Sequence, residues 1–220
     1  MARKKLAVLI SGRGSNLQSL IDAARSPDYP AQIALVISNR PEAPGLDLAR
    51  AAGVKAVAID HKVYATRPAF EARLHATLLE ADVDLICNAG FMRLLTGGFV
   101  DRWRDRHLNI HPSLLPAFPG LDTHQRALDE GVRITGCTVH FLRLEMDAGP
   151  IVAQAAVPVL ADDTAETLGA RVLAAEHKLY PHALRLVASG AARVVDEAVV
   201  FRGALNQQAS LFSPGLEVAT

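Results

Sequence analysis

Residues 107–124 read HLNIHPSLLPAFPGLDTH, and the character of the chain changes at this stretch. Before it, short apolar, β-branched runs alternate with helical patterns, which predicts a mostly parallel sheet with helices on both faces. After residue 122, a short helix and two strands joined by a turn rich in Asp and Gly predict an antiparallel hairpin at one edge of that sheet. We therefore expect an α/β fold, a Rossmann-like open twisted sheet, in a single domain over residues 1–220.

The same patterns place the individual elements. The strands are expected at Lys5–Ser11, Ile33–Ser38, Val54–Ile59, Leu85–Ala89, the residues leading to His111, Ile134–Leu142 and Ile151–Val157. The helices are expected at Asn16–Ala24, Gly45–Ala52, Pro68–Ala81, Thr96–Arg106, Thr123–Asp129 and Thr164–Ala188. Thr164 or a neighbouring Asp would cap the last helix, and Pro181 would bend or divide it. We expect residues from about 203 to 220 to fray, and Leu115–Pro116 is the first candidate for a cis peptide bond.

Composition limits the functions open to the chain. Its 220 residues can bury about 70% of the unfolded surface in one domain. Acidic and basic residues balance at 23 each, so overall charge favours neither nucleic acid nor an anionic membrane. Cys87 and Cys137 lie in apolar runs without metal-site spacing, which predicts a buried, reduced pair. The run Leu6–Ile10 is too short for a signal peptide, and no stretch approaches the roughly 18 apolar residues of a membrane span. We expect a soluble, cytoplasmic protein, and the sequence leaves a homodimer open.

Two polar side chains end the strand within residues 107–124. Asn109 and His111 alternate with apolar Leu108 and Ile110, and residues two apart in an extended chain point to the same face. Pro112 favours an extended backbone at His111. An amide and an imidazole side by side can hold a carbonyl oxygen as it becomes a tetrahedral oxyanion. A strand end with an ordinary structural histidine is the alternative, and the pair alone leaves both interpretations open.

A glycine-rich loop, residues 11–16 (SGRGSN), follows the first expected strand and opens a helix. Glycines permit a tight turn, and the free N–H groups of a helix start attract an anion, so the loop could hold a phosphate; a turn capped by Ser15 or Asn16 is the alternative. Leu17 stands where a dinucleotide-binding Gly-x-Gly-x-x-Gly pattern needs its third glycine. The second strand lacks the acidic residue that holds an NAD ribose, but Arg40 would suit NADP, so an NADP-dependent oxidoreductase stays open.

Three loops are expected to meet at one crevice. In open α/β sheets, ligands bind beyond the carboxyl ends of the strands. The loops that leave the first, fourth and fifth strands carry SGRGSN, GFMRLL and NIHP. The glycine-rich loop and the Asn–His pair should therefore border the same site.

The run NIHPSLLPAFPGLDTH resembles the signature of the folate-dependent formyltransferases, and several further motifs follow the family order from LAVLISGRGSNL to about Phe201. The resemblance implies transfer of the formyl group of 10-formyltetrahydrofolate, as cosubstrate, to the amine of glycinamide ribonucleotide (5'-phosphoribosylglycinamide) in purine biosynthesis. The amine would attack directly, with neither a metal nor a covalent enzyme intermediate. Formyltetrahydrofolate hydrolase is an alternative within the family, but the regulatory domain that such enzymes normally carry would have no room before Lys5.

The resemblance also assigns roles to residues. Asn109 and His111 would stabilise the oxyanion, while Asp147 would partner the imidazole, favour its charged form and assist proton movement. The implied ribonucleotide-binding residues are Gly14, Ser15, Asn16 and Glu176. The implied folate-binding residues are Arg67, Met92, Arg93, Leu94, Leu95, Asn109, Arg143, Leu144, Glu145, Met146 and Asp147. Without the family, Asp147 would be a turn residue, Phe91–Leu95 core filling, Arg67 a solvated side chain and Glu176 a charge on an exposed helix face.

Two further observations bear on the ligands. Leu173 and Ala174 stand where relatives often direct polar side chains at the phosphate, and Arg13 could supply that charge instead. His107, His124 and His140 could join His111 around a metal, but their spacing matches no known ligand pattern. We therefore expect no metal.

Overall fold

The computed structural model describes residues 2–203 and residue 213. The expected fraying of the tail thus falls almost entirely outside the described residues. The strands of the main sheet are β1 (Lys4–Ile10), β2 (Ala31–Ser38), β3 (Ala56–Ala58), β4 (Leu85–Asn88), β5 (His107–His111), β6 (Ile134–Phe141) and β7 (Ile151–Pro158). The helices are α1 (Ser15–Ala24), α2 (Pro44–Ala51), α3 (Arg67–Glu80), α4 (Gly97–Arg102), α5 (Thr123–Asp129) and α6 (Ala165–Ala188), with a short 3-10 helix, η1 (His61–Val63).

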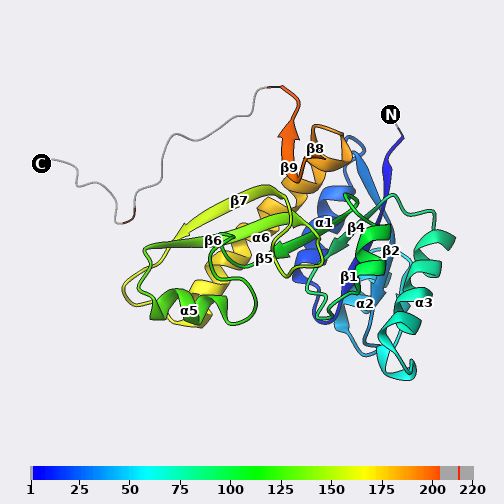
Figure 1. The fold of residues 1–220 in the computed structure, drawn as a ribbon, viewed down its shortest axis with the longest axis horizontal. Helices are drawn as coiled ribbons and strands as arrows, with labels where there is room; N and C mark the ends of the chain where they lie inside the picture. Colours follow the sequence, from blue (N-terminus) through cyan, green and yellow to red (C-terminus); the bar gives the residue numbers. More distant parts are fainter. Residues whose placement is uncertain (1, 204–212, 214–220) are drawn as a thin grey trace, which may run out of the picture.

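The sheet runs in the order β3-β2-β1-β4-β5-β6-β7 (Figure 1). Strands β1 to β5 pair in parallel, whereas β6 and β7 pair antiparallel at one edge. This confirms the expected mostly parallel sheet with an antiparallel edge hairpin. From β1 the chain builds outward to β2 and β3, and it then returns to the other side of β1 for β4 and β5. The strand order therefore reverses between β1 and β4, where open α/β sheets place their ligands.

Two apolar layers cover the sheet. Leu6, Val8 and Ile10 of β1 are buried in one cluster with side chains of α1, α2 and α6. Ala7 and Leu9, which point the other way, are buried with side chains of α3 and with the aromatic residues that follow β4. Successive residues of β1 thus enter opposite layers, as a parallel strand covered on both faces requires.

Several expectations about local structure are confirmed. Leu115–Pro116 is cis. Thr164 caps α6 and forms a reciprocal capping box with Thr167. Cys87 and Cys137 are buried free thiols, and burial raises the pKa of each to about 12.

Two expectations need correction, and one element was missed. The helix expected over residues 96–106 is confined to α4, because residues 103–106 instead form the turns that lead into β5. Of the two outcomes expected at Pro181, a bend or a division, the division is wrong, because α6 continues through Pro181 from Ala165 to Ala188. An additional hairpin, β8 (Ala192–Val195) and β9 (Ala198–Phe201), was not predicted; it forms a separate two-stranded sheet near the end of α6 (Figure 1).

Candidate active site

The loops after β1 and β4 contact each other at the reversal point. The backbone N–H of Ser11 donates to the carbonyl of Gly90 at 3.1 Å. The Ser11 hydroxyl accepts from the N–H of Met92 at 2.8 Å and donates to the side chain of Asn39. Ser11 is only 4% exposed, so the hydroxyl joins three strand ends inside the protein. The glycine-rich loop therefore has a fixed place beside the loop that follows β4.

The glycine-rich loop borders a small hollow of about 160 Å³ that it shares with Ala89 and Gly90. Gly14 has φ +81°, a conformation that favours glycine. A Cβ on Gly14 would lie 3.2 Å from the Cα atom of Gly45 at the start of α2. A Cβ on Gly45 would lie 2.6 Å from the Cδ1 atom of Ile10. The loop backbone and the start of α1 can lie this close to α2 only because both positions are glycine.

Asn16 and Glu176, which the family resemblance assigned to one substrate, are in contact. The Asn16 amide donates to the Glu176 carboxylate at 2.7 Å, although the two residues are 160 positions apart. Glu176 is 6% exposed, so the alternative of an ordinary charge on an exposed helix face is wrong. Burial raises the pKa of Glu176, and the amide of Asn16 partly opposes that rise. The Asn16 Oδ1 atom is buried and has no partner among the described residues, which leaves one acceptor for a ligand.

His111 and Asp147 also meet. The Nδ1 atom of His111 lies 3.4 Å from a carboxylate oxygen of Asp147, and both side chains are at most one-tenth exposed. The same oxygen accepts from the N–H of Gly120 at 2.8 Å. The other ring nitrogen of His111 lies 2.9 Å from the carbonyl oxygen of Phe118, which can only accept. His111 therefore carries a hydrogen on Nε2, and Nδ1 is the atom that faces the carboxylate and the site.

His140 fixes the amide of Asn109. The two residues are directly paired across β5 and β6, with the Asn109 nitrogen 3.2 Å from His140 Nε2. Burial lowers the pKa of His140, so the ring is neutral, and its Nδ1 donates to the carbonyl of Phe141 at 3.0 Å. Nε2 is then an acceptor, and the Asn109 amide nitrogen must point toward it. One N–H of Asn109 is used in this way, and the second remains to donate to another group.

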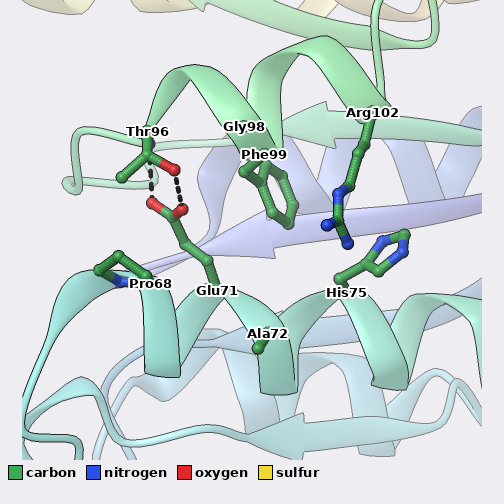
Figure 2. A pocket seen from close by; sticks show the side chains of 8 residues that line it. All are labelled: Pro68, Glu71, Ala72, His75, Thr96, Gly98, Phe99 and Arg102. Atoms are coloured by element: carbon green, nitrogen blue, oxygen red, sulfur yellow. Dashed lines mark hydrogen bonds between the residues drawn. The ribbon is translucent and has the colours of Figure 1, made fainter.

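The segment Met92–Leu95 is anchored at both ends. Met92 is bound by Ser11, and Thr96, which follows Leu95, donates from its N–H to the buried carboxylate of Glu71 on α3 at 2.8 Å and also donates from its hydroxyl. Figure 2 shows Glu71 and Thr96 facing each other at one end of a hollow between α3 and α4. A backbone segment held in this way can present its own N–H and C=O groups to a flat polar ring.

The turn at residues 143–147 lies next to this segment. The Leu144 side chain is 3.6 Å from the Cβ position of Gly97, directly after Thr96, and Met146 lies 3.8 Å from that of Gly120. Leu144 and Met146 are 69% and 52% exposed. Leu144 therefore lies beside the end of the Met92–Leu95 segment and Met146 beside the loop that contains Gly120, and both apolar side chains are largely exposed.

Two assigned residues do not join this group through their side chains. Arg67 is exposed at the start of α3, and no hydrogen bond or ion pair within the described residues involves its side chain. The Arg143 side chain turns away to Asp105 and Glu197. Arg143 was expected among the folate-binding residues, and this orientation of its side chain leaves only its backbone for that role.

Ser11, Gly45 and His140 contribute to the site although sequence reasoning assigned them no such role. The sequence suggests a role for His140 only as a possible metal ligand. Alternation in β6 could have indicated that His140 lies opposite the Asn–His pair, but the strand register was required to pair it with Asn109.

Clusters of metal-ligating side chains and helices able to span a membrane are both absent from the described residues. Within residues 2–203, no three His, Cys, Asp or Glu side chains are grouped as metal ligands. Burial lowers the pKa of His107 to about 3, and its Nε2 contacts the Asn88 side chain at 2.8 Å. Among the described helices, none combines the length and apolar composition required to cross a bilayer.

Comparisons with known proteins agree on one family. The model of the formyl transferase family matches residues 4–184. The trifunctional purine biosynthetic protein adenosine-3 of Bos taurus is 53% identical over 87% of this chain, and the chain spans about a fifth of that relative, 19% of its length. The phosphoribosylglycinamide formyltransferase of Haemophilus influenzae is 42% identical over 91% of this chain and 94% of its own. The crystal structure of glycinamide ribonucleotide transformylase 1 from Symbiobacterium toebii has 49% identity and a TM-score of 0.88, covering 90% of this chain and 94% of that one.

Proposed function

The chain belongs to the formyl transferase family, and we propose that it transfers the formyl group of 10-formyltetrahydrofolate to the amine of 5'-phosphoribosylglycinamide in purine biosynthesis. The observation that carries the proposal is the convergence of Asn109, His111 and Asp147 at the carboxyl end of β5. An amide donor, an imidazole and a carboxylate are the groups that an acyl transfer through an oxyanion requires. On this proposal the partners are small molecules, the enzyme acts in the cytoplasm, and the reaction needs no metal.

The two substrates approach from opposite sides of these three residues. The phosphate of the ribonucleotide binds the loop N–H groups at Gly14, Ser15 and Asn16, where a helix start favours an anion. The Glu176 carboxylate and the Oδ1 atom of Asn16 accept hydrogen bonds from the same substrate. The pterin ring of the folate lies between the backbone of Met92–Leu95 and the turn at residues 143–147.

Each catalytic group has one task. The amine nitrogen attacks the formyl carbon, which forms a C–N bond and a tetrahedral oxyanion. The free N–H of Asn109 stabilises that oxygen. His111 adds a second donor in its doubly protonated form, which a neighbouring carboxylate favours and in which Nδ1 carries a hydrogen in addition to the one on Nε2. The oxyanion collapses as the bond from the formyl carbon to the folate N10 atom breaks. The proton lost by the amine ends on N10, with Asp147, directly or through water, as the group that can carry it.

A formyl-transfer assay on the purified chain tests this function. Turnover should require both substrates, and omission of the ribonucleotide should abolish it; rapid folate turnover without the ribonucleotide would indicate a hydrolase instead. NADPH consumption would indicate an oxidoreductase.

Asn109→Ala provides the matched test of the assigned site. We expect a 10²–10³-fold loss in kcat, the usual cost of one oxyanion donor. Gln125→Ala removes an exposed amide on α5 and should change kcat little. Near-native turnover by Asn109→Ala would remove the amide from the mechanism.

A further inference from the structure

An ion-pair cluster holds the first residue of the turn that ends in Asp147. The guanidinium of Arg143 donates through Nη2 to Asp105 at 2.6 Å and through Nε to Glu197 at 2.7 Å. It also donates through Nη1 to the carbonyl of Leu142 at 2.9 Å. Three nitrogens of one side chain are thus occupied, and that side chain is only 9% exposed.

Glu197 lies in the two-residue turn between β8 and β9, where it adopts φ +59°. This hairpin follows residue 184, the last residue that the family model matches. Arg104, before β5, also pairs with Glu197. Glu197 therefore joins the unpredicted hairpin to the turn at residues 143–147 and to the segment that precedes β5.

The cluster combines one buried charge with exposed ones: the Arg143 side chain is 9% exposed, whereas the side chains of Asp105 and Glu197 are 44% and 55% exposed. Burial by itself would lower the pKa of Arg143, but its hydrogen bonds with Glu197 and Asp105 outweigh burial and raise it. The hydrogen bond from Arg143 likewise lowers the pKa of Glu197. The two carboxylates that accept hydrogen bonds from Arg143 belong to segments 38 and 54 residues away in sequence.

The rest of the turn has weaker support. Leu144, Glu145 and Met146 are exposed, and the carboxylate of Asp147 is the next charged group anchored to the protein, through Gly120. Asp147 itself has φ +55°. The backbone between residues 143 and 147 is thus fixed mainly at its two ends, by Arg143 and by Asp147.

We propose that Glu197 is a positioning residue, through which the β8–β9 hairpin holds Arg143 and thereby keeps the turn at residues 143–147 closed against the folate. The part of this inference that concerns folate rests on the proposed function; the contact between the hairpin and the turn does not. Removing the Glu197 charge should loosen the folate side of the site and leave the ribonucleotide side, built by the glycine-rich loop and Glu176, unchanged.

Glu197→Gln in the full chain tests the proposal, with Asp196→Asn as its matched control. Asp196 is the neighbouring acid in the same turn, has φ +47°, and forms no ion pair within the described residues. For Glu197→Gln we expect the KM for 10-formyltetrahydrofolate to rise about fivefold, the upper end for an ion pair whose carboxylate is exposed. The KM for the ribonucleotide should stay within about twofold, as should both constants in Asp196→Asn.

Limited trypsin digestion gives a second readout that needs no substrate. Trypsin cleaves after arginine, and the Arg143–Leu144 bond should be cut faster in Glu197→Gln, with cleavage after exposed Lys62 as the internal reference. Unchanged cleavage at Arg143 together with an unchanged folate KM would overturn the proposal. Equal rises in both KM values would overturn it too, because they indicate general destabilisation. If the wild-type chain lacked formyl transfer, the proposed function would fail, and digestion would still decide whether Glu197 holds the turn.

Discussion

His140 should affect catalysis only through Asn109, and a double-mutant cycle can test this. His140 is neutral because burial lowers its pKa, and its Nε2 accepts from the Asn109 amide at 3.2 Å. His140→Leu removes that acceptor and leaves the Asn109 amide free to rotate. His140→Gln offers a carbonyl oxygen in place of Nε2, so it can still accept the hydrogen bond.

The size of each effect follows from the typical energy of the interaction that each substitution removes. A hydrogen bond between neutral groups contributes about 1 kcal/mol net, so His140→Leu should lower kcat about fivefold. Asn109→Ala removes an oxyanion donor, which costs about 3 kcal/mol or roughly 150-fold. If His140 acts only by orienting Asn109, then Asn109→Ala/His140→Leu should be no slower than Asn109→Ala. The coupling energy would then be about 1 kcal/mol, within the range found for residues in contact.

Steady-state kcat values for the wild type, both single variants and the double variant complete the cycle. His140→Gln should recover most of the kcat that His140→Leu loses.

His140 Nε2 also lies 3.8 Å from Asp147, so a direct role of His140 in proton transfer is the competing idea. Under that idea the two losses would multiply to about 800-fold, and the pH profile of kcat would shift in His140→Leu even without Asn109. Multiplicative losses would therefore refute the orienting role.

Three other predictions concern the surroundings of the site. Gly45→Ala places a Cβ 2.6 Å from Ile10, so we expect a loss of about 1–3 kcal/mol in urea unfolding and a raised KM for the ribonucleotide, with folate KM as the control. Burial lowers the pKa of His107 to about 3, below its ordinary 6.5, so the unfolded chain binds a proton that the folded chain excludes between these values. Stability should therefore fall as pH drops from 6.5 toward 3, by up to about 1.4 kcal/mol per pH unit from this group, and His107→Gln, which can still donate to Asn88, should flatten that slope. Thr164→Ala removes the cap of α6 and should cost about 1 kcal/mol in unfolding with kcat unchanged; a loss of activity at full stability would contradict a purely structural cap.

Local patterns predicted the sheet because each parallel strand is a short apolar run between turn residues. The β8–β9 hairpin was missed for the opposite reason. Its strands have four residues each, and apart from Ala192 their side chains are at most partly buried. Their turn, Asp196-Glu197, lacks glycine although both residues adopt positive φ. The close approach at Gly45 could not be predicted either, because it depends on where α2 lies relative to the first loop, a tertiary relation that local sequence does not contain.

Some site residues are likewise placed by local sequence patterns and others by long-range contacts. Asn109 and His111 share a face because strands have a period of two, and pairing of β5 with β6 places His140 opposite Asn109. A one-residue slip of that register would turn His140 to the other face of the sheet. The same slip would misplace the buried side chains of the strand, so burial fixes the register and with it the hydrogen bond to the Asn109 amide. The position of Asp147 is not fixed by strand register, because Asp147 lies in a turn. That turn depends on Gly149, where a Cβ would lie 1.7 Å from a carbonyl oxygen of β6, and on the ion pairs of Arg143. Changes far from the site should therefore disturb the carboxylate and the folate side more readily than the oxyanion donors. Comparing salt dependence tests this order: high salt, which screens charges, should raise the folate KM before it lowers kcat.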